Sequence, residues 1–377
     1  MARAVDVVVV GAGVIGLALS WRAAEAGRSV VLCDPHPGEG ASWAAAGMLA
    51  PVTEASVVEA PLTRLGLESA RRWPAFAAAL SEAAGGAEVG LREEGTLAVA
   101  FDSDDRRQLE QLLRVHHSLG LTSEWLPAAD CRRLEPRLSP RIRGALRVAG
   151  DWQVDNRAVV RALLTAVSAA GVTQRRVSVR RLIGNGSRVD GVELADGTHL
   201  AAATVVLAAG AHSGTIEGLP APARPPVRPV KGEILRLAGD PADPVLEHTV
   251  RASVEGRSVY VVPRRHGEVV VGASSQEAGF DTRVRAGAVE ELLRAAVDLV
   301  PGLAELELVE CRAGLRPGTP DNGPVLGRTP VAGLVLATGH YRNGMLLTPV
   351  TVDAIDEVLA GHDLPEVAAP FTLERFW

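Results

Sequence analysis

The sequence predicts an α/β protein whose two domains interleave along the chain. Three features point to this fold. A run of valines, Val7–Val10, leads into a glycine-rich turn and an apolar helix. Buried strands that end in small residues recur near the middle and the end of the chain. Between them, apolar and polar residues alternate, which is typical of antiparallel strands with one buried face.

The first strand and its turn, residues 5–16, form the most informative stretch. Consecutive valines indicate a strand buried on both faces, as in a parallel sheet. Gly11, Gly13 and Gly16 follow it with the spacing G-x-G-x-x-G. These glycines would allow a tight turn, the close approach of a pyrophosphate and close packing of the next helix on the strand. The free N–H groups at the start of that helix would attract the anion.

A helix over residues 17–26 and a second strand over 29–33 complete the unit, and Asp34 stands at the end of this strand. A carboxylate at that position is placed to accept hydrogen bonds from a ribose. Strand, helix, strand and acid together indicate a dinucleotide-binding site. The motif alone does not distinguish NAD from FAD.

Small residues crowd the next stretch, 41–50, which begins with Ala41 and Ser42. Such residues let the backbone approach either a flat ligand or another element closely. We expect Ser42 to cap the following turn and to direct its N–H groups toward a phosphate. A tightly packed, alanine-rich helix start accounts for the pattern equally well.

The remaining elements follow from periodicity and turn residues. We expect residues 124–136, which include two prolines, to be irregular, and the strand over 307–312 to end before a loop that carries Arg316. The other expected helices span 61–80, 104–119, 156–171, 284–299 and 350–359, and the other expected strands span 95–101, 175–183, 191–194, 204–211, 233–237, 258–263, 268–272 and 331–337.

The order of these segments predicts two discontinuous domains. Nucleotide-binding segments lie at the start, middle and end of the chain, with sheet-rich segments between them. We therefore assign residues 1–88, 150–229 and 310–377 to a nucleotide-binding domain, and residues 89–149 and 230–309 to a substrate-binding domain.

Composition excludes several classes of protein. The net charge of −6 argues against a role in binding nucleic acid or a polyanionic membrane surface. The three cysteines are far apart, and no metal-binding or hydrolase motif occurs, so we expect no metal site and a reducing, cytoplasmic location. No apolar run resembles a signal peptide or a membrane span. Lys231 is the single lysine among arginines, which a bias in codon usage explains.

Three side chains remain as candidates for chemistry. Arg316 and Arg342 both lie in glycine-rich stretches, where a guanidinium is suited to bidentate binding of a carboxylate. Tyr260 lies in a strand and could donate to the same carboxylate. Taken singly, each arginine fits a surface position at least as well.

These motifs resemble those of the FAD-dependent D-amino-acid-oxidase-like enzymes. They are most similar to the members that oxidise glycine for thiamin synthesis. The similarity runs along nearly the whole chain, through residues 10–16, 44–49, 260–264, 270–273, 313–319 and 339–344. It implies a Rossmann-like FAD-binding domain with an interleaved antiparallel-sheet substrate domain.

The resemblance also implies roles for individual residues. Arg316, in L-R-P-G-T, would hold the substrate carboxylate, and Tyr260, in Y-V-V-P, would assist it. Arg342, in R-N-G, would line the flavin and the substrate site. The residues implied to bind FAD are Gly11, Ala12, Gly13, Val14, Ile15, Gly16, Asp34, Ala41, Ser42, Ala46, Gly47, Met48, Val177, Ala209, Gly210, Gly314, Gly339, His340, Tyr341, Arg342, Asn343, Gly344, Met345 and Leu346.

The implied reaction is oxidation of glycine, or of a small amine such as sarcosine or D-alanine, to the 2-oxo acid, ammonia and hydrogen peroxide. Its partners would be a small amino-acid substrate and O2, in a homotetramer. Gly314 stands where related sarcosine oxidases attach flavin through a cysteine, so we expect non-covalent FAD.

Alternatives stay open at this point. A sarcosine or D-amino-acid oxidase, a dehydrogenase that reduces a quinone, and a flavin-binding protein without turnover all fit the same motifs. Asp34 replaces the glutamate that is commoner in flavoproteins, which keeps NAD open. Ser258 and Ser275 differ from the usual pocket residues of the family and leave the substrate open.

Overall fold

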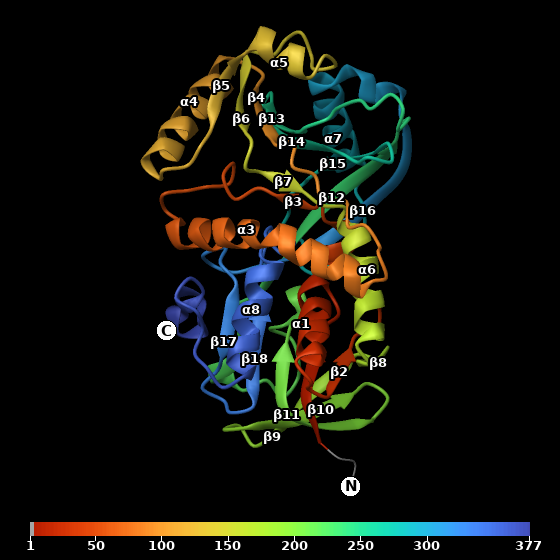
Figure 1. Ribbon diagram of the computed structural model, residues 1–377, viewed down its shortest axis with the longest axis vertical. Coiled ribbons are helices and arrows are strands. Elements are labelled where there is room, and N and C mark those ends of the chain that lie inside the picture. Colours follow the sequence, from red (N-terminus) through yellow and green to blue (C-terminus); the bar gives the residue numbers. More distant parts are fainter. Residues whose placement is uncertain (1–3) are drawn as a thin grey trace.

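The computed structural model describes residues 4–377. Two halves follow one another along its long axis, each built around one sheet (Figure 1). The predicted fold class is confirmed, because a mainly parallel sheet with helices on one face is interleaved in sequence with a mainly antiparallel sheet.

The first sheet unites segments that are far apart in the chain. β1 pairs in parallel with β2 on one side and with β11 on the other, and β11 pairs in parallel with β18. The main strands, in spatial order, are β17 (Val325–Arg328), β18 (Leu334–Thr338), β11 (His199–Leu207), β1 (Val5–Val10), β2 (Val30–Cys33) and β8 (Thr173–Arg175), and β10 (Val189–Leu194) and β9 (Val179–Gly184) continue from β11.

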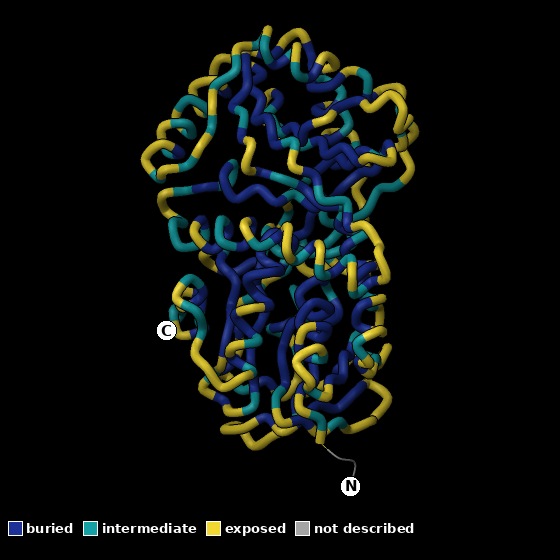
Figure 2. Tube along the Cα trace, in the orientation of Figure 1, coloured by how far each residue is buried: buried dark blue, intermediate teal, exposed yellow. Residues whose placement is uncertain are grey.

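Both faces of this sheet are covered, which explains the run of valines. Val7 and Val9 pack toward helices, whereas Val8 and Val10 pack toward β9 and β10. The helices whose apolar residues join the first cluster are α1 (Val14–Glu25), α3 (Ala60–Ala83), α6 (Asn156–Ala169) and α8 (Thr348–Leu359). Figure 2 shows the buried interior that results.

The second sheet forms the other half of the molecule, where α7 (Ala286–Leu299) packs on its strands. All its pairings are antiparallel except that of β13 with β4. Its strands, in spatial order, are β16 (Glu307–Gly318), β12 (Arg228–Ala238), β15 (Glu268–Gly272), β14 (Arg257–Pro263), β13 (Thr249–Val254), β4 (Thr96–Ala100), β6 (Gly144–Val148) and β5 (Glu124–Pro127).

The remaining elements are short or peripheral. A two-stranded ribbon joins β3 (Met48–Leu49) to β7 (Trp152–Gln153) where the two halves meet (Figure 1). The other helices are α2 (Ala41–Ala44), α4 (Ser103–Ser118) and α5 (Ala128–Leu134), and the 3-10 turns are η1 (Gly210–His212), η2 (Ala221–Ala223), η3 (Pro301–Glu305), η4 (Ala369–Phe371) and η5 (Leu373–Phe376).

Several local predictions were wrong. Residues 124–136 contain β5 and α5, and β6, β13 and β17 had no predicted counterpart. The strand predicted over 175–183 is broken at residues 176–178. The strand predicted to end at Arg312 continues to Gly318, because β12 pairs with it along its whole length. Arg316 therefore lies in a strand and not in a loop. The division into domains stays a prediction, and β16 pairs within the second sheet.

Candidate active site

A cavity of about 950 Å³ lies where the two sheets meet. One end is lined by the glycine turn after β1 and by the ends of β2 and β11. The other end is lined by β12, β14 and β16 of the second sheet. A ligand that fills this cavity would contact both halves of the protein.

Most of the predicted site residues line this cavity, although they come from eight separate stretches of sequence. The predicted residues that line it are Gly11, Ala12, Gly13, Val14, Ile15, Asp34, Ala41, Ser42, Ala46, Gly47, Met48, Ala209, Gly210, Tyr260, Gly314, Arg316, His340, Tyr341, Arg342, Asn343, Gly344 and Met345.

The glycine turn has the close packing that its spacing indicated. Gly11 has a φ of +101°, and a Cβ there would meet the backbone of Ala208. A Cβ on Gly16 would overlap the carbonyl oxygen of Gly11. Gly16 therefore lets helix α1 start directly beneath the turn, and it packs under the cavity wall instead of lining it.

Asp34 and Ser42 both bind the backbone of this turn. One Asp34 carboxylate oxygen accepts a hydrogen bond from the Ala12 N–H at 2.7 Å, and the other accepts from the His36 N–H at 2.8 Å. The Ser42 hydroxyl accepts from the Val14 N–H at 2.9 Å. Ser42 thus caps α1, whereas we expected it to cap the turn that follows it. Its own helix, α2, starts after Gly40.

Three further predicted residues lie outside the cavity wall. Val177 falls in the break between β8 and β9, and the wall there is formed by Ser178, Val179 and Arg180. The Leu346 side chain is buried in the helix-side core. Gly339 packs under the wall, since a Cβ there would lie 2.7 Å from Thr319 Cγ2.

Arg316 and Tyr260 meet at the other end of the cavity. The guanidinium of Arg316 lies over Gly232 of the neighbouring strand, and the Tyr260 hydroxyl lies over Gly272. Arg316 Nη1 donates to the Ser274 carbonyl at 3.1 Å. Burial raises the pKa of Tyr260, although Arg316 opposes this shift. The phenol therefore keeps its proton near neutral pH and can donate a hydrogen bond.

A second group of charges lines the same end. Arg342 lies with its guanidinium carbon 5.0 Å from the centroid of the Tyr341 ring. Arg251, the cross-strand neighbour of Tyr260, forms an ion pair of 3.1 Å with Glu54. Neither Arg251 nor Glu54 was singled out from sequence, because β13 gives no strong strand signal and Glu54 lies in a loop.

The sequence also gave no role to Arg264, which follows Pro263 in the Y-V-V-P-R motif. Its buried guanidinium donates to Gln153 Oε1 and to the Val154 carbonyl, both at 2.7 Å, and to the Ala46 carbonyl at 2.6 Å. Burial lowers its pKa to about 10, so it stays charged. Arg264 thereby fixes the Ala46–Gly47 segment of the cavity wall.

His340 is the buried imidazole of the cavity wall. Its Nε2 lies 2.9 Å from Thr351 Oγ1. Burial lowers its pKa to about 3. His340 is therefore neutral near pH 7 and would not exchange a proton with a substrate there.

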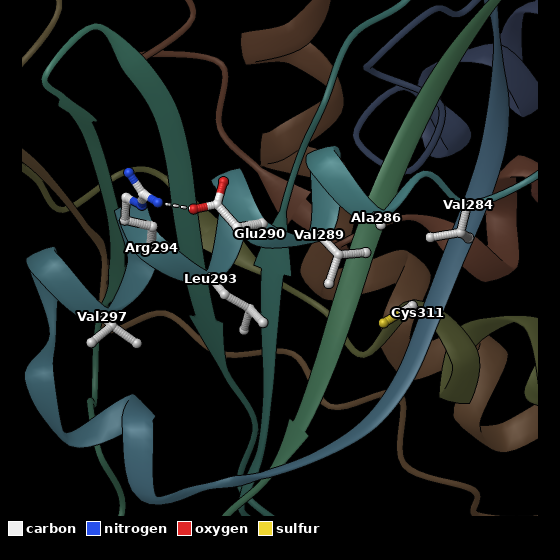
Figure 3. A pocket seen from close by; sticks show the side chains of 8 residues that line it. All are labelled: Val284, Ala286, Val289, Glu290, Leu293, Arg294, Val297 and Cys311. Atoms are coloured by element: carbon white, nitrogen blue, oxygen red, sulfur yellow. Dashed lines mark ion pairs between the residues drawn. The ribbon is translucent and has the colours of Figure 1, made fainter.

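A second hollow lies between α7 and β16 and has few polar groups that could bind a substrate (Figure 3). Its lining is mostly aliphatic, and its two charged side chains, Glu290 and Arg294, pair with each other. Cys311 lines this hollow, and burial raises the pKa of its thiol. Its side chain therefore lies apart from the cavity that Gly314 lines.

Within residues 4–377, no three histidine, cysteine, aspartate or glutamate side chains gather closely enough to hold a metal ion. Among the same residues, none of the helices has the length and apolar character needed to cross a membrane.

Comparison with known proteins shows to which family the chain belongs. Residues 6–357 match the family model described as FAD dependent oxidoreductase. The chain belongs to this family. This FAD-dependent oxidoreductase is 34% identical to glycine oxidase from Geobacillus kaustophilus (strain HTA426). The match covers 100% of this chain and 98% of the relative. The crystal structure of glycine oxidase from Geobacillus kaustophilus superposes with a TM-score of 0.89 and covers 98% of both chains.

A further relative is longer than this chain. The oxidoreductase is 33% identical to the bifunctional protein ThiO/ThiG from Trichormus variabilis (strain ATCC 29413 / PCC 7937), over 98% of this chain. The match covers 55% of that relative, so this chain spans about half of it.

The residues of the oxidoreductase fit FAD. The glycine turn and the N-terminus of α1 offer a close-packed anion site for a pyrophosphate. Small residues, Ala44, Ala46 and Gly314, line the wall between the turn and Arg316. Gly314 lets β16 pack directly on α2, since a Cβ there would lie 2.8 Å from Ala44 Cβ. FAD is the cofactor of this family, and here it would extend from the glycine turn toward Arg316.

Proposed function

We propose that this protein oxidises glycine, and small amines such as sarcosine or D-alanine, to the 2-oxo acid, ammonia and hydrogen peroxide. The observation that carries the proposal is the convergence of Arg316 and Tyr260 at the end of the cavity opposite the dinucleotide turn. A guanidinium and a phenol together suit one carboxylate. The relatives named glycine oxidase, at 34% identity, support the same substrate.

The side chains would orient the substrate. Arg316 binds the carboxylate and Tyr260 donates a hydrogen bond to it, which holds the Cα–H bond in one direction. FAD, when bound, supplies the electron acceptor for the Cα–H bond. The substrate must lose its ammonium proton, and His340 is a poor acceptor for it, because burial lowers the pKa of this imidazole to about 3. We infer that the proton leaves to solvent or to Glu54, the carboxylate beside Arg251.

We propose that FAD is held without a covalent bond to cysteine. Gly314 takes the place where an attachment would form, and Cys311 lies in the outer hollow of Figure 3. Protein denatured in acid would then release all its flavin into the supernatant. Flavin that stays with the precipitated protein would contradict this.

The assembly and the pathway are proposed on resemblance alone. We propose a cytoplasmic homotetramer that uses O2 as the electron acceptor and whose product feeds the synthesis of the thiamin thiazole. The relative named ThiO/ThiG supports the last part.

The test is anaerobic addition of glycine to the purified, yellow protein. We expect the flavin absorbance to bleach, and O2 to restore it with release of hydrogen peroxide. Bleaching by sarcosine or D-alanine but not by glycine would assign a different substrate to the same site. Flavin that stays reduced in air would indicate a dehydrogenase, and a lack of bleaching by any small amino acid would overturn the proposal.

A further inference from the structure

The single lysine of the chain has a specific place in the structure. Lys231 lies on β12 with its side chain fully buried, and its Nζ is 3.0 Å from Glu233 Oε1, which is also fully buried. The same ammonium group donates to the Arg283 carbonyl. Codon bias accounts for the arginines elsewhere, but it does not explain why the one remaining lysine forms a buried ion pair.

The pair binds both ends of the segment 274–285, which follows β15. Glu233 Oε2 accepts a hydrogen bond from the Ser274 hydroxyl at 2.7 Å, and Glu233 Oε1 accepts from the Arg285 N–H at 2.9 Å. Burial alone would raise the pKa of Glu233, but the hydrogen bonds from Ser274 and Lys231 lower it, so the carboxylate is ionised. A charged acceptor makes these hydrogen bonds stronger than neutral ones.

The segment 274–285 is also part of the cavity wall. Ser274, Ser275 and Thr282 line the cavity beside Arg316. The Ser274 carbonyl accepts the 3.1 Å hydrogen bond from Arg316 Nη1. Ser274 therefore connects the two systems, with its hydroxyl on Glu233 and its carbonyl on Arg316.

We propose that Lys231 and Glu233 are a positioning pair for substrate binding. They hold the segment 274–285 in place as a wall of the cavity and, through Ser274, set the direction of the Arg316 guanidinium. This inference rests on the proposed function, in which Arg316 binds the substrate carboxylate. A compact ammonium suits the enclosed position, because a guanidinium is larger and planar and needs room for its fork of donors.

The test removes the hydroxyl that binds both the carboxylate and the backbone N–H of Glu233. Ser274→Ala removes the hydroxyl and leaves the ion pair in place. In the FAD-loaded enzyme, we expect the calorimetric Kd for acetate and the KM for glycine each to rise about tenfold, which corresponds to the loss of one hydrogen bond to a charged group. We expect kcat at saturating glycine to change less than about twofold, since the hydroxyl does not touch the reacting atoms.

The matched control is Glu277→Gln. Glu277 lies in the same segment and forms an exposed ion pair of 3.0 Å with Arg228, outside the cavity wall. We expect its acetate Kd to equal that of the wild type. An equal loss in both variants would show that general loosening of the segment matters and would overturn the positioning role.

Arg316→Ala separates this inference from the proposed function. If Arg316→Ala loses acetate binding while Ser274→Ala binds acetate like the wild type, the positioning pair is refuted and the carboxylate site stands. If Arg316→Ala binds acetate normally, the proposed carboxylate site itself is wrong, and the inference falls with it.

Discussion

At the scale of single residues, two glycines shape the carboxylate end of the cavity. Gly232 and Gly272 each lie under the polar end of a neighbouring side chain, the first under Arg316 and the second under Tyr260. Gly232 lies inside β12 and Gly272 ends β15, and a glycine in a strand weakens the sheet unless close approach is needed. They leave room for a guanidinium and a phenol to lie flat on the sheet.

Replacement of Arg316 should remove the charged partner of the substrate carboxylate. We expect Arg316→Ala to weaken glycine binding by about 2–5 kcal/mol, because one partner of a desolvated charge pair is lost. Steady-state kinetics would show this as a fall in kcat/KM. A kcat/KM within twofold of the wild type would refute the role of Arg316.

Replacement of Gly232 should weaken the same binding step by displacing the Arg316 guanidinium. A Cβ at this position would collide with the guanidinium of Arg316. We therefore expect Gly232→Ala to raise the KM for glycine about tenfold or more, since a small displacement of a positioning group is costly. Gly287→Ala is the control, because nothing lies within 4 Å of a Cβ there. Equal KM values for the two variants would contradict the prediction.

At the scale of elements, local sequence predicted some parts of the fold and site and missed others. The β1 turn was predictable because its glycines, its valines and Asp34 lie within one short stretch. The continuation of β16 to Gly318 was not, because it depends on pairing with β12, which lies about eighty residues earlier. The contacts of Arg264 were missed for the same reason, since Gln153 and Ala46 come from distant segments. The bond from Lys231 to the Arg283 carbonyl was missed likewise, although its ion-pair partner Glu233 lies only two residues away.

The buried ion pair on β12 should matter to the stability of its element. Lys231→Met would leave the Glu233 carboxylate buried without its cation. We expect the free energy of unfolding to fall by about 3–5 kcal/mol, as is usual when one partner of a buried pair is removed. Urea unfolding would measure this. Arg71→Met is the control, because Arg71 pairs with Glu68 at the surface with 72% of its side chain exposed. A loss no larger than that of the control would contradict the prediction.

At the scale of the whole molecule, two buried groups couple stability to pH with opposite signs. Burial raises the pKa of Asp151 from 3.8 to about 6, against the hydrogen bonds from Thr53 and Val52. Between pH 3.8 and 6, Asp151 is protonated in the folded protein and ionised in the unfolded chain. Its contribution to the free energy of unfolding is therefore full below pH 3.8 and is lost as pH rises through 6. Burial lowers the pKa of His340 from 6.5 to about 3, so its contribution is present above pH 6.5 and is lost as pH falls.

Asp151→Asn should remove one of these terms. We expect the free energy of unfolding of the variant, relative to the wild type, to rise by about 2 kcal/mol from pH 4 to pH 7, because most of the pKa shift falls in this range and each unit is worth about 1.4 kcal/mol. Urea unfolding at several pH values would measure the difference between the two proteins. A difference that stays constant with pH would show that Asp151 does not titrate in this range.

The interleaving of the two sheets also bears on how the chain is made. The glycine turn is synthesised before the strands that pair beside it: β1 lies between β2 and β11, and β11 needs β18, whose last residue is Thr338. The nucleotide sheet therefore cannot close until synthesis has passed Thr338. At about 5–20 residues per second, its valine-rich first strand stays without its full set of neighbours for tens of seconds. During that time an exposed apolar strand is prone to aggregation.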